Sequence, residues 1–153
     1  MNHNEVIAYL WTLGDFWLMA RNLWCEARNQ GRIGMQAVAQ VGMNRVNAPF
    51  YPKTIKKVVL QKNQFSWTIP GNVKNPAVIR YPWLYDLPAW RVAKEVAREA
   101  MDRYLPDLGL DKALFYRNPR TATSGWFQQQ IDSGLFIFIK RIKDHDFYKL
   151  REK

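Results

Sequence analysis

Residues 15–30 read DFWLMARNLWCEARNQ, and their apolar side chains recur at the three- and four-residue spacing of one helix face. Because Asp15 is a good N-cap residue, the pattern predicts a helix that begins at Phe16 and ends at Asn29-Gln30-Gly31. A stripe of this kind buries one face of a helix against other elements. It consists of Phe16, Met19, Ala20, Leu23, Trp24 and Ala27.

Similar patterns predict three further helices. The second is expected over residues 33–46. Thr54 is expected to cap a short third helix that ends near Leu60. The longest helix is expected from Pro88 to Leu105, with Tyr104 on its buried face. These segments indicate a mostly helical protein.

Two other segments are candidates for β-strands. Residues 64–69 read QFSWTI, and this alternation of polar and apolar residues predicts a short strand or hairpin arm. The apolar run at residues 135–139 fits a strand or a buried helix, and the pattern leaves the choice open. The expected fold class is therefore mainly α (α+β) with a small β element.

The composition is that of a globular protein. The 153 residues are 48% hydrophobic and 14% aromatic, which suffices for one core and excludes a disordered or collagen-like chain. No internal repeat or linker is present, so residues 1–153 are expected to form a single domain. No basic leader or membrane-spanning apolar segment is evident, so we expect synthesis in the cytoplasm without a signal peptide.

The charge is distributed unevenly. The formal net charge is +10, and residues 27–85 hold nine Lys and Arg but no Asp or Glu. Glu26 is the last carboxylate before this basic stretch. Either the stretch is a solvated surface, or it binds an anionic polymer such as nucleic acid or cell-envelope material.

Glu26 is the leading candidate for chemistry. At about 100° per residue it lies about 20° from Met19 around the predicted helix, on the flank of the apolar stripe. Partial desolvation there raises a carboxyl pKa, as a general acid near neutral pH requires. The alternative is a structural ion pair with Arg28, Arg45 or another base that holds two helices together. Cys25 adjoins Glu26 in sequence but does not face it on a helix.

Other familiar site patterns are missing from the sequence. It has no phosphate-binding loop, no GxGxxG, no CxxC and no pair of histidines at metal-ligand spacing. No metal ion and no cofactor are therefore expected.

Several ordered motifs resemble the SleB-like cell-wall hydrolases, a family that includes spore-cortex-lytic enzymes and phage lysins. The resemblance covers about residues 15–148. Its motifs are Ala20 to Arg28, Gly34 to Ala39, Asn44-Arg45-Val46, Tyr51-Pro52, Gln61, Gln64 to Trp67, Phe115 to Pro119 and His145 to Tyr148.

The resemblance implies a lysozyme-like, mainly α fold. It also implies cleavage of peptidoglycan between N-acetylmuramic acid and N-acetylglucosamine, in the manner of a lytic transglycosylase. The family's catalytic glutamate falls on Glu26. Two motifs depart from the family, because Asn29-Gln30 replaces Gly-Glu and Lys143-Asp144-His145 replaces Gly-Asn-His. These departures concern loop shape and substrate preference.

A single carboxylate is consistent with a lytic transglycosylase, because the C6 hydroxyl of the substrate attacks its own anomeric carbon. Glycosidases that use water or a protein nucleophile need two carboxylates flanking the bond. Asp86 and Asp111 remain candidates for a second acid, which would make the protein a hydrolytic muramidase.

Four further residues are candidates for substrate binding. Gln64 and Ser66 are expected to hydrogen-bond sugar hydroxyl or N-acetyl groups, and Trp67 and Tyr116 to stack on pyranose faces. Each has an alternative role in the core or in a turn. His145 is expected to be a structural histidine, and the alternative is that it orients a loop.

Two rivals from other classes remain, a basic nucleic-acid-binding module and an inactive wall-binding domain. The bases are spread singly among apolar residues, so no nucleic acid is expected as a partner. The favoured setting is a monomeric phage endolysin, released through a permeabilised membrane, whose basic surface binds anionic wall or membrane polymers. A virion-associated lysin is the alternative.

Overall fold

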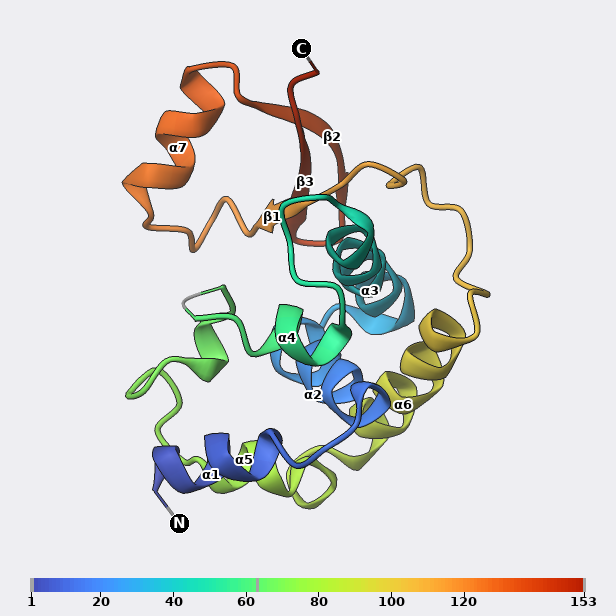
Figure 1. Cartoon of the computed structure of the whole chain (residues 1–153), viewed down its shortest axis with the longest axis vertical. Coiled ribbons are helices and arrows are strands. Elements are labelled where there is room, and N and C mark those ends of the chain that lie inside the picture. Colours follow the sequence, from blue (N-terminus) through green and yellow to red (C-terminus); the bar gives the residue numbers. More distant parts are fainter. Residues whose placement is uncertain (1, 63, 153) are drawn as a thin grey trace.

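The computed structural model describes residues 2–62 and 64–152 (Figure 1). The lower part of the view is helical, and the upper part holds a small sheet with one further helix beside it. The helices are α1 (His3–Leu10), α2 (Asp15–Ala27), α3 (Gly31–Asn47), α4 (Ile55–Val59), α5 (Ala77–Arg80), α6 (Leu87–Met101) and α7 (Gly125–Asp132), with 3-10 turns η1 (Ser66–Thr68) and η2 (Pro82–Leu84). The strands are β1 (Phe115–Arg117), β2 (Phe136–Ile142) and β3 (His145–Leu150).

The larger core is built around α2, which packs against α3, α4 and α6. Eight of its thirteen residues are buried, so the helix has core on most of its sides. Leu18, Leu23 and Trp24 are among the large side chains at its centre. The indole Nε1 of Trp24 also donates to the Asp86 carbonyl at 3.3 Å, which fixes α2 to the start of α6. The stripe predicted for this helix is therefore confirmed.

A smaller core joins α3 to the sheet. Ala37 and Val41 pack with Ile142 and Phe147 of the hairpin. The three strands are antiparallel in the order β1-β3-β2. The undecided run at residues 135–139 thus contributes to strand β2. Since α3 belongs to both cores, it sets the position of the sheet relative to α2.

The turn between β2 and β3 is attached to the start of α3 by one side chain. The Gln30 amide donates to Asp144 Oδ2 at 3.0 Å, and its oxygen accepts from the Asp144 backbone N–H at 2.9 Å. Gly34 leaves room for this side chain, because a Cβ at Gly34 would lie 2.2 Å from Gln30 Cβ. The departure from the family pattern at Gln30 is therefore a structural link between a helix and a hairpin.

The second and third predicted helices are confirmed as α3 and α4. Thr54 caps α4 as expected, with its side chain accepting from the Lys57 N–H. Asp15 does not cap α2, because Gly14 is the N-cap residue. Its carboxylate instead accepts from the Lys56 N–H in the first turn of α4 at 3.0 Å. The cap was assigned to the wrong helix because sequence order hides this contact.

The strand predicted at residues 64–69 is wrong. Residues 66–68 form the 3-10 turn η1, and Thr68 Oγ1 donates to the Phe65 carbonyl at 2.7 Å. Trp67 is held by a long-range bond from its Nε1 to Asn22 Oδ1 at 2.9 Å. Tertiary anchoring of the indole and local turn bonds therefore override the alternating pattern.

The helix predicted from Pro88 to Leu105 ends early, at Met101, and α3 is three residues longer than the helix predicted over residues 33–46. Arg103 adopts a positive φ of 62°, and the Tyr104 N–H donates to the Glu99 carbonyl at 2.8 Å, which closes the helix end. Tyr104 is consequently 79% exposed, and its predicted burial is wrong.

Within the described residues, no helix is both long and apolar enough to cross a membrane.

The contact between Asp15 and α4 gives a testable consequence for stability. Asp15→Ala leaves a backbone donor of α4 without its partner, so we expect the free energy of unfolding to fall by about 1 kcal/mol. Asp15→Asn keeps an acceptor oxygen and serves as the matched control, with a smaller loss. Urea unfolding measures both. Equal losses in the two variants would show that the hydrogen bond is not the cause.

Candidate active site

Glu26 lies in the last turn of α2, and its carboxylate meets a tyrosine from the sheet. Tyr116 of β1 donates its hydroxyl to Glu26 Oε2 at 2.9 Å. The Tyr116 ring packs edge-on against His145, with centroids 5.1 Å apart, and lies against Phe147 at 5.6 Å. The packing of helix and sheet therefore brings together two residues that are 90 positions apart in the sequence.

The surroundings of Glu26 favour its protonated form. Burial raises the pKa of the Glu26 carboxyl above its ordinary value, while the Tyr116 hydrogen bond and the charge of Arg45 offset part of the rise. Burial and the nearby carboxylate raise the pKa of Tyr116 well above its usual range, so its hydroxyl keeps its proton and remains a donor. Glu26 is thus suited to act as an acid.

The alternative role for Glu26, a structural ion pair, does not fit the contacts. Among the described residues no Lys, Arg or His nitrogen lies within ion-pair distance of its carboxylate. The Arg28 guanidinium instead lies over the Trp24 ring, 4.1 Å from its centroid. Burial also raises the pKa of the Cys25 thiol, which keeps that neighbour unreactive.

Arg45 is a buried charge near the Glu26–Tyr116 pair and is 5% exposed. Its Nε donates to the Leu114 carbonyl at 2.9 Å. Its guanidinium carbon lies 5.2 Å from the ring centroids of both Tyr51 and Phe65. Among the described residues its Nη1 has no hydrogen-bond partner. Arg45 is thus a packing residue whose positive charge also lowers the pKa of the Glu26 carboxyl.

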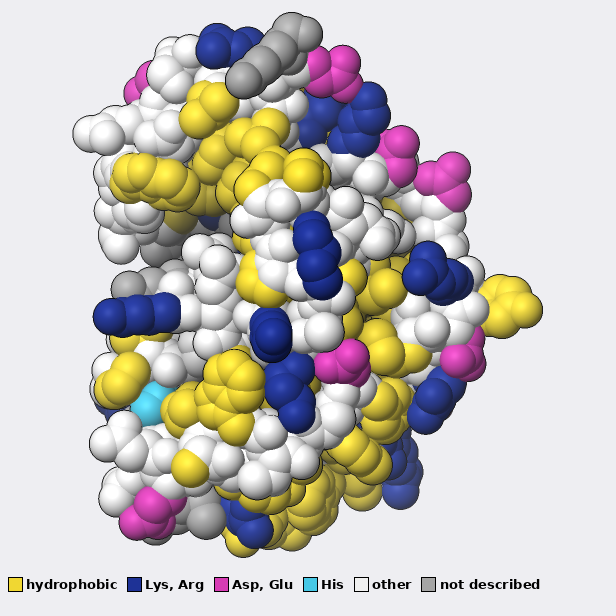
Figure 2. Space-filling view, in the orientation of Figure 1, with side chains coloured by type: hydrophobic (Ala, Val, Ile, Leu, Met, Phe, Trp, Pro, Cys, Tyr) yellow, Lys and Arg dark blue, Asp and Glu magenta, His cyan; other side chains and the backbone are white. Residues whose placement is uncertain are grey.

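A cleft of about 480 Å³ opens beside Tyr116, and we call it the aromatic cleft. Helix α7 contributes to one wall, and Gln64 lies in its lining on the helical side. Figure 2 shows the surface hollowed on the left between these two parts of the chain. None of its described lining residues is Asp or Glu. They are Arg45, Phe50, Tyr51, Gln64, Phe115, Tyr116, Trp126, Phe127, Leu135, Phe136 and Leu150.

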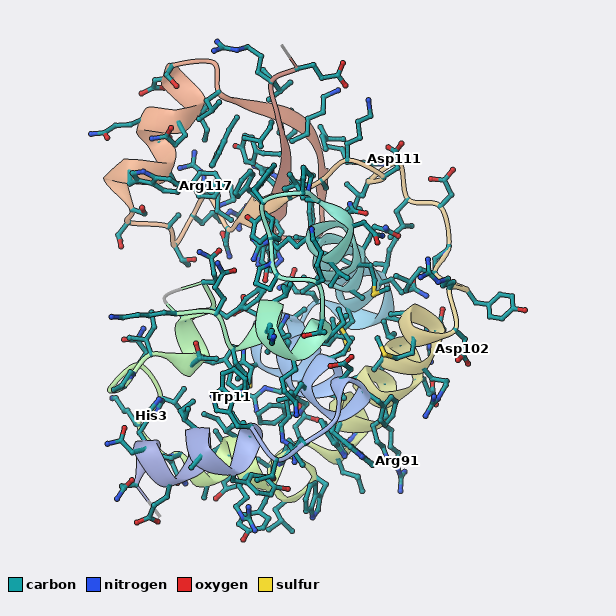
Figure 3. The ribbon with its side chains drawn as sticks, viewed as in Figure 1. His3, Trp11, Arg91, Asp102, Asp111 and Arg117 are labelled. Atoms are coloured by element: carbon teal, nitrogen blue, oxygen red, sulfur yellow. The ribbon has the colours of Figure 1, made fainter. Side chains whose placement is uncertain are left out.

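Helix α7 is attached to the sheet through Arg117 of β1. The Arg117 Nη2 donates to Gln128 Oε1 at 2.7 Å, and its guanidinium carbon lies 5.2 Å from the Phe127 ring centroid. Figure 3 shows Arg117 between α7 and the sheet. This contact holds the aromatic residues of α7 against the cleft.

The predicted substrate-binding residues do not all meet at this cleft. Gln64 lines it, and Ser66 is exposed on η1 outside its lining. Trp67 is 4% exposed in the larger core, so it offers little ring surface to a sugar. Tyr116 lines the cleft through its ring, and its hydroxyl makes the bond to Glu26 that the stacking prediction did not anticipate.

The cleft also contains residues that the sequence reading missed. Trp126 and Phe127 follow Ser124, whose side chain caps α7 by accepting from the Phe127 N–H. A capping serine followed by two aromatic residues was the available signal. Tyr51 was noted only as part of a motif.

Asp86 and Asp111, the two candidates for a second catalytic acid, do not line the aromatic cleft. Asp86 caps α6, where its Oδ1 accepts from the Ala89 N–H at 3.2 Å. Asp111 is exposed and lines a separate hollow of about 530 Å³.

His145 touches the Tyr116 ring, and burial lowers its pKa, which favours neutral imidazole. The described residues contain no group of three or more His, Cys, Asp or Glu arranged to hold a metal ion.

This combination of a mainly α fold and one desolvated carboxyl beside an aromatic cleft defines a lysozyme-like protein. The family model described as Cell Wall Hydrolase matches residues 29–148. The chain belongs to the cell wall hydrolase family. Glu26 lies just before the matched segment, so its assignment depends on the site geometry and on the motif around it.

Named relatives agree with this membership. The spore cortex-lytic enzyme of Oceanobacillus iheyensis is 32% identical over 135 residues, which are 88% of this chain and 41% of the relative. That of Bacillus subtilis is 30% identical over 133 residues, which are 87% of this chain and 37% of the relative. The chain thus spans about two fifths of the length of these relatives.

Two solved structures share the fold. One is the catalytic domain of the germination-specific lytic transglycosylase SleB from Bacillus anthracis, with a TM-score of 0.63 and 29% identity over 88% of this chain and 93% of that one. The other is the catalytic domain of the Bacillus cereus SleB protein, with a TM-score of 0.60 and 28% identity over 88% of this chain and 89% of that one. The predicted lysozyme-like, mainly α fold is confirmed.

The bond between Tyr116 and Glu26 predicts a change in acidity. A hydrogen bond to a carboxylate stabilises the charged form, so Tyr116→Phe should raise the pKa of Glu26 further. Carbon NMR of labelled glutamate carboxyls, assigned by comparison with Glu26→Gln, measures the titration midpoint. Tyr51→Phe removes a hydroxyl from the same cleft and is the control. An unchanged or lower midpoint in Tyr116→Phe would contradict the role assigned to the bond.

Proposed function

We propose that the protein cleaves the peptidoglycan bond between N-acetylmuramic acid and N-acetylglucosamine as a lytic transglycosylase, with Glu26 as its acid and base. The observation that carries the proposal is the hydrogen bond from Tyr116, which lines the aromatic cleft, to the desolvated Glu26 carboxylate behind it. The described lining of the cleft itself contains no carboxylate. The SleB catalytic domain of Bacillus anthracis, which has this fold, is described as a germination-specific lytic transglycosylase.

The reaction uses one carboxyl group twice. Protonated Glu26 gives its proton to the glycosidic oxygen as the bond from that oxygen to the anomeric carbon breaks, and the sugar on that oxygen leaves as an alcohol. The Glu26 carboxylate then takes the proton of the C6 hydroxyl of the remaining sugar. The C6 oxygen bonds to the anomeric carbon, which closes a 1,6-anhydro ring and restores protonated Glu26. Because the nucleophile is already attached to the substrate, its proximity is ensured.

The surroundings of Glu26 suit both proton transfers. Burial keeps a larger share of the carboxyl protonated before cleavage. The Tyr116 hydroxyl and the Arg45 charge stabilise the carboxylate that exists between the two steps. Aromatic rings in the cleft fit the apolar faces of pyranose rings, and Gln64 offers an amide to their polar groups.

A hydrolytic muramidase is the alternative within the same family of reactions. It needs a second carboxylate on the other side of the bond. Asp86 is engaged in capping α6, and Asp111 lines a different hollow, so these contacts favour the single-acid route.

We also propose the biological setting of a phage endolysin that reaches the wall after the membrane is permeabilised. A net charge of +10 supports attraction to anionic wall or membrane polymers. Expression in a bacterial cytoplasm with and without a pore-forming partner tests this setting, with lysis expected only when both proteins are present. Lysis without the partner would contradict it.

Replacement of the acid is the direct test of the reaction. Glu26→Gln keeps the shape of the side chain and an acceptor for Tyr116, but it removes the proton that must be given and recovered. We expect release of soluble glycan fragments from purified sacculi to fall by a factor of about 10² or more. Mass spectrometry of the wild-type products should find 1,6-anhydro ends. Hydrated ends would identify a hydrolase.

The stability of Glu26→Gln distinguishes a catalytic role of Glu26 from a structural one. The raised pKa of Glu26 stabilises the wild type below the ordinary glutamate pKa, and this contribution is lost as pH rises through the folded-state pKa. At neutral pH the melting temperature of Glu26→Gln should therefore equal or exceed that of the wild type. A well-folded Glu26→Gln variant that still cleaves the glycan would contradict the catalytic assignment of Glu26.

A further inference from the structure

A second set of aromatic and basic side chains lies across α2 from the active site. Trp17 precedes Glu26 by nine residues on this helix. At about 100° and about 1.5 Å per residue, the two side chains project about 180° apart and lie about 14 Å apart along the axis. A ligand at Trp17 is thus on a different face of the molecule from the aromatic cleft.

Two indoles wall a hollow of about 270 Å³ on this second face, which we call the tryptophan hollow. Trp17 is 44% exposed and Trp83 is 39% exposed. Both lie against buried Trp90, with ring centroids 6.4 Å and 6.2 Å from it. The two exposed rings are therefore held by packing. The lining is Tyr9, Leu13, Trp17, Arg21 and Trp83.

A basic hollow of about 690 Å³ adjoins the tryptophan hollow, and Trp17 lines both. Arg91, Lys94 and Arg98 line it at positions i, i+3 and i+7 of α6, which places them on one helix face. Figure 3 shows Arg91 on the outer side of this helix. The one acid in the described lining, Glu95, is already paired with Arg32.

Several bases of the basic stretch at residues 27–85 are engaged within the protein. Of the nine bases in residues 27–85, Arg45 is buried and Arg32 pairs with Glu95 and Glu99. Arg80 lies over the Tyr9 ring, 3.7 Å from its centroid. These three bases therefore have partners within the protein, whereas the three bases on α6 line a hollow together with exposed Trp17.

We propose that the two hollows form a second binding site for a phosphate-bearing wall polysaccharide. A sugar ring enters between Trp17 and Trp83, and its phosphodiester lies on Arg91, Lys94 and Arg98. Arginine suits phosphate because its planar donors bind two oxygens at once. The choice of a wall polymer rests on the proposed function, while the requirement for a ring and an anion comes from this face itself.

Other occupants fit the site less well. A second copy of the chain would place like charges of α6 against one another, which opposes association. A bilayer is flat, whereas the two indoles line a concave hollow. The site therefore anchors the enzyme to one polymer while the opposite face of α2 cuts the glycan.

Binding to purified cell walls tests the site. Glu26→Gln is used as the background so that the walls stay intact during sedimentation. Adding Arg91→Gln and Lys94→Gln should weaken binding at low salt by about fivefold or more, and the difference should shrink as salt rises. Lys57→Gln with Lys74→Gln removes the same charge from exposed positions outside both hollows and is the matched control.

Walls treated with hydrofluoric acid, which removes phosphodiester-linked polymers, identify the ligand. The protein that carries Arg91→Gln and Lys94→Gln on the Glu26→Gln background, here called the α6 variant, should bind these walls as strongly as Glu26→Gln alone. Trp83→Ala should weaken binding to untreated walls by about fivefold when binding is measured well below the melting temperature of the variant. Equal losses in the α6 variant and the lysine control would overturn the proposal, and so would an unchanged difference on treated walls.

Binding to vesicles that contain anionic phospholipid tests a membrane as the alternative ligand. Binding that depends on Arg91 and Lys94 with vesicles but not with walls would overturn the proposal in favour of a membrane. Failure of the proposed function is distinguishable, because it is read from the products of the wild type. Absence of glycan products together with wall binding that depends on α6 would refute the reaction and leave the second site standing.

Discussion

The hydrogen bond from Tyr116 to Glu26 is the contact on which the site depends, because it joins the helical core to the sheet at the acid itself. Glu26 is desolvated because α2 is surrounded by other helices. Tyr116 is in place because its ring packs against both hydrophobic cores. Loss of either packing would separate the acid from its polar partner or admit water to it, and both changes alter its pKa.

The position of Tyr116 follows from two neighbouring side chains of α3. The Asn44 amide donates to the Leu110 and Ala113 carbonyls at 2.7 Å and 2.8 Å, and Arg45 donates to the Leu114 carbonyl at 2.9 Å. These bonds fix the backbone that leads directly into β1. The Asn44-Arg45 pair therefore aligns the strand that carries Tyr116, and the same Arg45 contributes charge near Glu26. One helix turn thus serves both geometry and electrostatics.

The sequence pattern predicted the apolar faces of helices, because these repeat locally along the chain. It did not predict contacts between residues that are distant in sequence. The stripe from Phe16 to Ala27 correctly gave α2 its buried side and placed Glu26 on its flank. It did not reveal that Asp15 caps a different helix, or that Trp67 bonds to Asn22, because both contacts join residues more than 40 positions apart. The alternation around Trp67 had no partner strand beside it, so it could not become sheet. Helix α7 escaped notice because its short apolar pattern closes a cleft instead of filling a core.

A one-carboxylate mechanism places opposing demands on Glu26. The group must hold a proton before the bond breaks, yet it must also exist as a carboxylate long enough to accept the next proton. Burial alone would satisfy the first demand and defeat the second, since a bare ion in an apolar site is costly. Tyr116 and Arg45 counter that cost without forming a close ion pair, because the Arg45 Nε is committed to the Leu114 carbonyl and its guanidinium is packed between aromatic rings. An arginine bound directly to Glu26 would hold it ionised. The arrangement seen here leaves both protonation states accessible, which is the condition that a single acid and base requires.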